Sequence, residues 1–206
     1  MNLRKILLSI LLNIPSRGGL FRRLYLILSA RDGVAWALYL KSGRLIYKMG
    51  DDCYVSPRAS ITDPGYLCMG NNVRLSDCTI LGHDGSVNMI NRALGTKLDS
   101  VGPVTLKDNV FVGHGAIICP GVSIGPNAIV GAGAVVRRNV NEGEIVIGSP
   151  AHVVGRLDEY VAKLKLRNES WPWRPLVESR SGDFDKDLEP MLVEMRQKYF
   201  FAQTSD

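Results

Sequence analysis

The chain has 206 residues, of which 46% are hydrophobic and 22% charged, and its formal net charge is +5 at pH 7. This composition supports a sizeable core in a soluble, globular protein, and so modest a positive charge does not indicate nucleic-acid binding. The four cysteines show no CxxC or Cys/His ligand spacing. We interpret them as small buried residues of a protein from a reducing, cytoplasmic compartment.

Residues 1–50 are predicted to form an N-terminal amphipathic, helical cap. The apolar run from Ile6 to Leu12 is too short to span a bilayer, and no small-x-small cleavage site follows it, which disfavours a signal peptide. Two interpretations stay open for residues 1–14. They form a helix that caps the fold or a partner, or a basic interfacial helix that makes peripheral contact with the inner face of the membrane.

A six-residue period dominates the middle of the chain. The repeating positions are all small or aliphatic: Val104, Val110, Ala116, Val122, Ala128, Ala134 and Val140. A second aliphatic register follows two residues later: Leu106, Val112, Ile118, Ile124, Val130 and Val136. Neither the 3.6-residue helix period nor the two-residue strand period keeps phase with this pattern. Such a short repeat predicts a solenoid over residues 51–156, in which three hexads complete a triangular coil and stacked coils bury the aliphatic positions.

An earlier tract of the same period is less regular. It comprises Val55, Ile61, Leu67, Val73 and Thr79. Asp63, Pro64 and Gly65 interrupt it, and the 25 residues from Thr79 to Val104 are not a multiple of six. The segment 82–103 is therefore expected to leave the coil as a loop. Because rigid scaffolds commonly carry function on the loops they position, this loop is the expected place of the chemistry.

Residues 157–206 are predicted to be a helical extension. Helical patterns cover 157–166 and 188–200, and the segment 168–183 between them is interpreted as an irregular linker. The first of these helices is expected to cap the last coil. Trp171 and Trp173 fit a packed tail better than an acceptor site.

The regular tract resembles the hexapeptide-repeat acyltransferases, a family with a left-handed parallel β-helix. The resemblance is carried by residues 110–114, residues 120–136 and the closing Gly148-Ser149-Pro150-Ala151, and it covers residues 53–156. It implies a mainly β fold, a left-handed parallel β-helix with helical N- and C-terminal segments. It also implies acetyl-CoA as acyl donor and a homotrimer with its sites between neighbouring subunits.

His83 stands where the first tract breaks into the loop. A histidine on a Gly-flanked loop has no obvious core role, and a neutral imidazole can accept the proton of a weakly nucleophilic hydroxyl. In galactoside, maltose and polysaccharide O-acetyltransferases a matching Gly-His or Thr-His-Asp-Gly element supplies the catalytic base, so the resemblance implies His83 as general base. Asp84 is the first candidate to orient the imidazole, although a surface or turn-forming role fits it equally well. Asp99 is a further candidate.

The same resemblance assigns coenzyme-binding residues: His114, Ala132, Gly133, Arg137, Arg138 and Arg156. His114 would line the pantetheine channel, and the small Ala132 and Gly133 would let an extended arm approach the backbone. An exposed backbone N–H there could stabilise the tetrahedral oxyanion. The arginines would supply positive charge for phosphates, with exposed, functionless arginines as the alternative.

We therefore predict an acetyl-CoA-dependent O-acetyltransferase that acts by direct transfer on a sugar hydroxyl of a surface polysaccharide, its lipid-linked precursor or a related saccharide. Serine or an amino sugar as acceptor stays open, as does a non-catalytic binding or scaffold role. A metal-dependent hydratase on this scaffold, as in the γ-class carbonic anhydrases, would need closely spaced histidines. His83, His114 and His152 are 31 and 38 residues apart, so no metal is expected.

Overall fold

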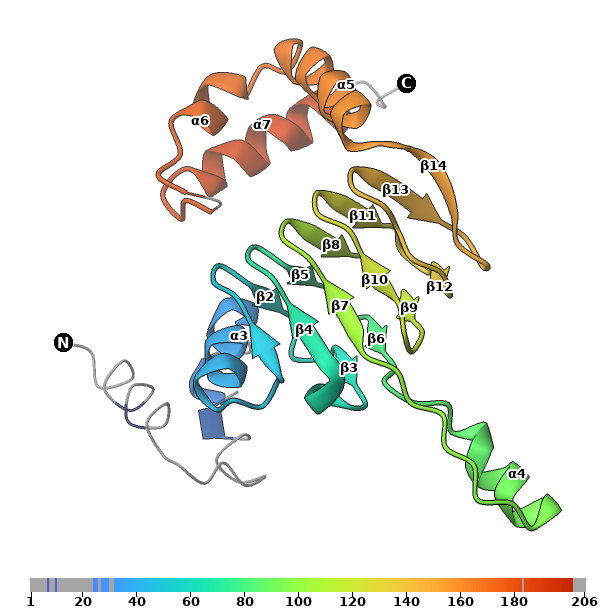
Figure 1. The fold of residues 1–206 in the computed structure, drawn as a ribbon. Coiled ribbons are helices and arrows are strands. Elements are labelled where there is room, and N and C mark those ends of the chain that lie inside the picture. Colours follow the sequence, from blue (N-terminus) through green and yellow to red (C-terminus); the bar gives the residue numbers. More distant parts are fainter. Residues whose placement is uncertain are drawn as a thin grey trace. The chain divides into compact units, whose positions relative to one another are not determined.

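The computed structural model describes residues 7, 10, 24, 25, 27–29, 32–182 and 184–201. The chain divides into two compact units, Met1–Leu157 and Asp158–Asp206, which we consider separately. Figure 1 follows the described elements along the chain.

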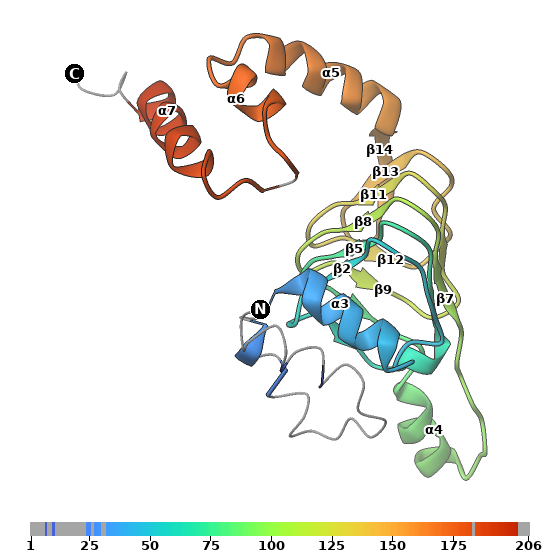
Figure 2. The ribbon, with the colours of Figure 1, turned by 90° about the vertical axis from the view of Figure 1, so that its left-hand side faces the viewer.

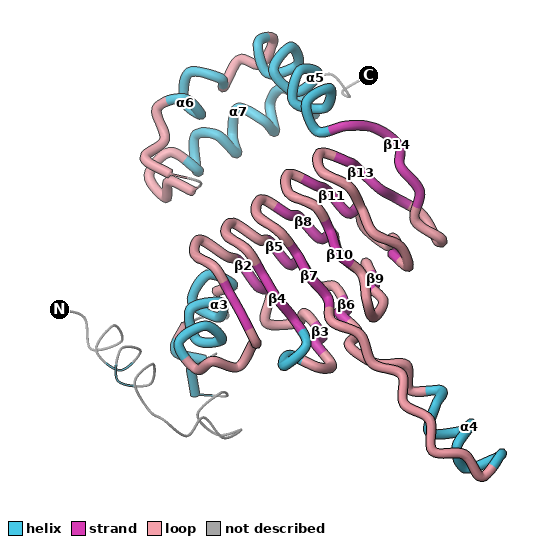
Figure 3. The backbone as a smooth tube through the Cα atoms, viewed as in Figure 1, coloured by secondary structure: helices cyan, strands magenta, loops and turns pink. Residues whose placement is uncertain are grey.

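The first unit is a coil of short strands stacked in three sheets (Figures 1 and 3). One sheet contains β1 (Lys48–Met49), β4 (Leu67–Met69), β7 (Val104–Leu106) and β10 (Ser123–Ile124). The second contains β2 (Tyr54–Val55), β5 (Arg74–Leu75), β8 (Val110–Val112), β11 (Ala128–Val130), β13 (Glu144–Ile147) and β14 (His152–Arg156). The third contains β3 (Ser60–Ile61), β6 (Thr79–Ile80), β9 (Ile117–Ile118) and β12 (Val135–Val136). All described strand pairs are parallel except β13–β14.

The predicted six-residue period is the packing unit of this coil. Successive strand residues point to opposite faces, so positions two apart in one strand both point inward. Every residue of the two aliphatic registers is at most 5% exposed. The residue between them points outward, as Phe111 does in β8. The predicted parallel β-helix with helical segments on both sides is confirmed.

The earlier tract departs from the predicted phase at two places. Val55 pairs with Leu75, whereas Leu67 pairs with Val104, so the two residues belong to different registers. The shift occurs where a short 3-10 helix, η1 (Pro64–Tyr66), is inserted. The expectation that Thr79 points into the core is also wrong. Thr79 pairs with the outward Ile117, and Cys78 and Ile80 are buried instead, because the turn before β6 is shorter than the regular turns.

One corner of the coil is closed by a ladder of asparagines. Asn72, Asn109 and Asn127 all have positive φ angles, a conformation in which asparagine is tolerated better than most residues. The amide Nδ2 of Asn72 donates to Oδ1 of Asn109 at 3.0 Å, and Nδ2 of Asn109 donates to Oδ1 of Asn127 at 2.8 Å. The first pair is 37 residues apart and the second 18, yet both make the same contact.

Residues between Gly82 and Gly102 leave the coil after β6, and we call this segment the arm. It contains α4 (Ser86–Leu94), none of whose residues is buried, and the helix ends at Gly95 with a φ of 65°. At its base Gly102 N–H donates to Gly82 C=O at 2.9 Å, and His83 forms an antiparallel bridge with Val101. Figures 1 and 2 show α4 at the tip of the arm, away from the coil.

The helix α3 (Gly33–Ser42) lies at the N-terminal end of the coil, beside β2 (Figure 2). The Asp32 carboxylate caps it by accepting from the backbone N–H groups of residues 34 and 35, and its Trp36 and Tyr39 rings stack inside the core. Apart from residues 7 and 10, the segment 1–14 lies outside the described residues, so the interfacial-helix prediction falls there. No helix in the described part of the chain is long and apolar enough to cross a membrane.

The second unit begins within α5 (Leu157–Glu169) and continues through α6 (Arg174–Glu178) and α7 (Glu189–Phe201). Trp173 is buried, stacks on Trp171 and meets the ring of Tyr199 edge-on. These aromatic contacts all lie within the second unit.

Candidate active site

His83 is held by a carboxylate from the preceding coil. Its ring Nδ1 lies 2.6 Å from Oδ2 of Asp63, which is 20 residues earlier in the chain. The two residues occupy the same corner of successive coils, directly after β3 and β6. We call this the His83 corner. The imidazole side chain is 44% exposed and the Asp63 side chain 23%, so the ring stands at the surface with its inner edge on the carboxylate.

Backbone geometry makes this contact possible. A Cβ on Gly82 would lie 2.5 Å from Cβ of Asp63, so only glycine lets the carboxylate approach this closely. The residues inserted around η1 widen the turn that carries Asp63. Gly82 N–H also donates to Asp63 Oδ2 at 3.2 Å. The residues inserted around η1 therefore shift the phase of the early repeat and also place Asp63 where its carboxylate contacts His83.

The electrostatics of the pair favour an ionised carboxylate. The hydroxyl of Thr62 donates to Asp63 Oδ2 at 2.6 Å. This hydrogen bond and then the His83 ring hold the pKa of Asp63 below its usual value. An ionised Asp63 can only accept, so Nδ1 carries the proton that it shares with the carboxylate. The second ring nitrogen, Nε2, then presents a lone pair outward and can accept a proton.

The two carboxylates considered from the sequence have other partners. Asp84 Oδ1 accepts from the backbone N–H of Ser86 at 3.0 Å, at the start of α4. Hydrogen bonding from the Ser86 side chain and then from its backbone lowers the pKa of Asp84. Asp99 Oδ1 accepts from the N–H of Ser100 at 2.9 Å. The carboxylate that contacts the His83 ring is instead that of Asp63, a residue that the sequence marks only as an interruption of the repeat.

His114, Ala132 and Gly133 lie at a different corner, after strands β8 and β11, which we call the His114 corner. Gly133 N–H donates to the backbone C=O of His114 at 2.8 Å, so the two turns are stacked directly. All three residues are exposed. A Cβ on Gly113 would lie 2.6 Å from the backbone nitrogen of Ala132, which shows how closely these turns approach.

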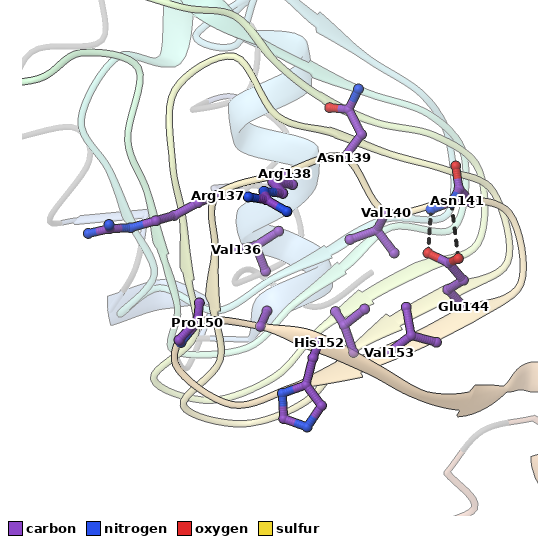
Figure 4. Close-up of a pocket in the computed structure, with 12 residues that line it drawn as sticks. Val136, Arg137, Arg138, Asn139, Val140, Asn141, Glu144, Pro150, His152 and Val153 are labelled. Atoms are coloured by element: carbon purple, nitrogen blue, oxygen red, sulfur yellow. Dashed lines mark hydrogen bonds between the residues drawn. The ribbon is translucent and has the colours of Figure 1, made fainter.

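Arg137 and Arg138 follow β12 and line a pocket of about 520 Å³ near the end of the coil (Figure 4). Pro150, in the turn between β13 and β14, and His152, at the start of β14, also line it. Glu144 contributes a carboxylate that Asn141 holds by two hydrogen bonds. Arg156, which is predicted to bind the coenzyme together with the two arginines, is not among the lining residues. It ends β14 opposite Glu144, and its guanidinium lies against Gly143.

No cluster of three or more histidine, cysteine, aspartate or glutamate side chains capable of holding a metal ion occurs among the described residues.

Comparison with known proteins identifies the repeat. The bacterial transferase hexapeptide family, defined by six repeats, matches residues 103–138. CapG of Staphylococcus aureus is 34% identical over 128 residues, which cover 60% of this chain and 74% of CapG. The chain belongs to the hexapeptide-repeat transferase family. Its coil is accordingly the left-handed parallel β-helix of that family.

Two other relatives carry names of acetyltransferases. Galactoside O-acetyltransferase of Escherichia coli is 24% identical over 146 residues, which cover 71% of each chain. A Saccharomyces cerevisiae protein is 34% identical over 121 residues, which cover 59% of this chain and 61% of the yeast protein. The chain thus spans less than two thirds of the length of that yeast relative.

The hexapeptide tract was visible in the sequence, whereas the Asp63–His83 contact was not. A signal for it existed, because Asp63 begins the interruption of the early tract and lies one coil before His83.

Proposed function

We propose that this protein is an acetyl-CoA-dependent O-acetyltransferase that acetylates a sugar hydroxyl, with His83 as general base. The observation that carries the proposal is the Asp63–His83 pair: a carboxylate at 2.6 Å from Nδ1 of an exposed imidazole. It gives the ring one tautomer and leaves Nε2 available to a hydroxyl proton. Family membership supports acyl transfer as the reaction class.

The proposed reaction is a direct transfer. His83 Nε2 removes the proton of the acceptor hydroxyl as its oxygen attacks the thioester carbonyl carbon. The ionised Asp63 stabilises the imidazolium that forms. The carbon–sulfur bond of the tetrahedral intermediate then breaks, and coenzyme A leaves as the thiolate and takes up a proton. No acyl-enzyme is required, because the described contacts of His83 pair it with a carboxylate rather than with a serine or cysteine.

Two regions suit the donor. Small, exposed turns at the His114 corner leave room for an extended pantetheine arm, with Ala132 and Gly133 as its backbone contacts. Arg137 and Arg138 supply positive charge at a pocket, where their guanidinium groups would bind phosphates bidentately. Arg156 remains a candidate only if the coenzyme extends toward β14.

The acceptor is proposed to be a saccharide. The name of the Escherichia coli relative points to a galactoside acceptor for that protein, and here the exposed polar residues Asn88 and Arg92 on the arm suit hydroxyl groups. We propose a homotrimer with sites between neighbouring subunits, as the family likeness implies, so that the arm of one copy reaches the donor region of the next.

Coenzyme A release measured with acetyl-CoA and a panel of sugars, amino sugars and serine tests the proposal. We expect turnover with a sugar hydroxyl and a decrease in kcat of about 10²–10⁴-fold in H83Q, because the base is lost. K107Q, an exposed change at another corner, serves as the matched control. Near wild-type turnover by folded H83Q would refute His83 as base, and turnover with amino sugars alone would make the enzyme an N-acetyltransferase.

A further inference from the structure

A second carboxylate–histidine cluster lies at the His114 corner. Oδ2 of Asp77 is 2.5 Å from a guanidinium nitrogen of Arg58 and 3.6 Å from Nδ1 of His114. Its other oxygen, Oδ1, accepts the hydroxyl hydrogen of Ser56. The four residues come from three successive coils, so the cluster runs along the stack.

Asp77 is the fixed member of this cluster. Its side chain is only 17% exposed. Ser56, itself 5% exposed, donates to it and accepts from the backbone N–H of Arg58 at 3.2 Å. The backbone C=O of Asp77 accepts from Gly115 N–H at 2.8 Å, which ties the turn of His114 to it. The Ser56 hydrogen bond, followed by the charge of Arg58, holds the pKa of Asp77 below its usual value.

His114 is the exposed member. Its side chain is 75% exposed, and its Nδ1 edge is turned toward Asp77, so Nε2 is the ring nitrogen left for a ligand. On the next coil Ala132 and Gly133 provide no side chain beyond a methyl group. A chain-like ligand lying along this corner would therefore have bare backbone on one side and an imidazole on the other.

Resting on the proposed function, we propose that Asp77 is a positioning residue for His114 and orients its ring so that Nε2 faces a polar group of coenzyme A. The carboxylate faces Nδ1, and Nε2 is left for the ligand. Ser56 and Arg58 fix the carboxylate. The function of the cluster is thus to present an oriented ring nitrogen at the coenzyme side of the site.

Asp77 and Arg58 contribute differently to this orientation. Asp77 faces the ring itself, whereas Arg58 contacts the carboxylate of Asp77. Removing Asp77 should therefore weaken coenzyme A binding more than removing Arg58. A cluster that serves folding alone would lose stability with either change and coenzyme A affinity with neither.

The test is titration of the full-length protein with coenzyme A. H114A removes the proposed contact, and we expect it to bind about tenfold more weakly than wild type. D77N should lose about two- to fivefold, because exposed charge pairs are weak, and R58Q should lose less than D77N.

A double-mutant cycle separates positioning from folding. D77N added to H114A should have no further effect on coenzyme A affinity, because its action passes through the ring. If D77N does not fold, S56A, which removes one hydrogen bond but keeps the charge, should give a smaller loss in the same direction. Unchanged affinity in D77N, or an equal loss with and without His114, would overturn the inference. Absent acetyl transfer together with Asp77-dependent binding would refute the proposed function alone.

Discussion

A single oxygen of Asp63, Oδ2, accepts from the backbone N–H of Gly82 and contacts Nδ1 of His83. The main chain and the side chain at the root of the arm are therefore held by the same atom. The direction in which the arm leaves the coil and the orientation of the imidazole are set together.

The orienting role of Asp63 can be compared directly with that of Asp84. We expect D63N to lower kcat with the best sugar acceptor by about 10- to 100-fold, because the neutral amide stabilises the imidazolium less than a carboxylate does. D84N removes only the carboxylate that contacts Ser86 N–H and should cost less. Steady-state kinetics of both variants decide the matter. A larger loss in D84N would transfer the role to Asp84.

Substitution of Gly82 should damage both stability and activity. The added methyl group of G82A would lie 2.5 Å from Cβ of Asp63, and such overpacking typically costs about 1–3 kcal/mol. G85A is the matched control, since nothing lies within 4 Å of its added Cβ. Urea unfolding and coenzyme A release should show a loss for G82A alone. Equal stability and equal coenzyme A release in the two variants would argue against close packing of Asp63 on Gly82.

Truncating an inward-pointing residue of a strand should destabilise the protein more than truncating its outward-pointing neighbour. Ile118 is 0% exposed and Ile117 is half-buried on the outer face of β9. I118A should therefore destabilise the protein by about 2–5 kcal/mol, as for buried aliphatic truncations, and I117A by clearly less. Urea midpoints with unchanged m-values provide the measurement. Comparable losses would mean that the outer face is covered in the folded protein.

Acid stability should depend on Asp63. Its pKa is lowered in the folded protein, chiefly by the Thr62 hydroxyl and then by His83, so its stabilising effect is present above the ordinary value of 3.8 and is lost as the pH falls below it. D63N should thus be less stable than wild type at neutral pH, and the difference should narrow on acidification. Thermal unfolding across this pH range measures it. A difference that widened with acidification would contradict the assignment.

The six-residue period predicted the coil, because in a coil of this kind buried positions recur once per turn. Val110 and Ala128 occupy the buried positions expected of them. Thr79 was misplaced because a turn shortened by one residue moves the whole following strand to the other face. The helix α4 lies in the segment that the sequence predicts to be a loop, and none of its residues is buried. Asp63 could not be placed from spacing alone, because the contact depends on the irregular turn around η1.

The asparagine ladder shows that the coil tolerates an insertion between two of its turns. Asn72 and Asn109 meet with the same amide contact as Asn109 and Asn127 although the arm is inserted between the first two. The coil closes as if the arm were absent, and the entropic cost of a longer insertion rises only slowly with its length. An arm of different length or sequence can therefore be inserted here without altering the stacking of the coils.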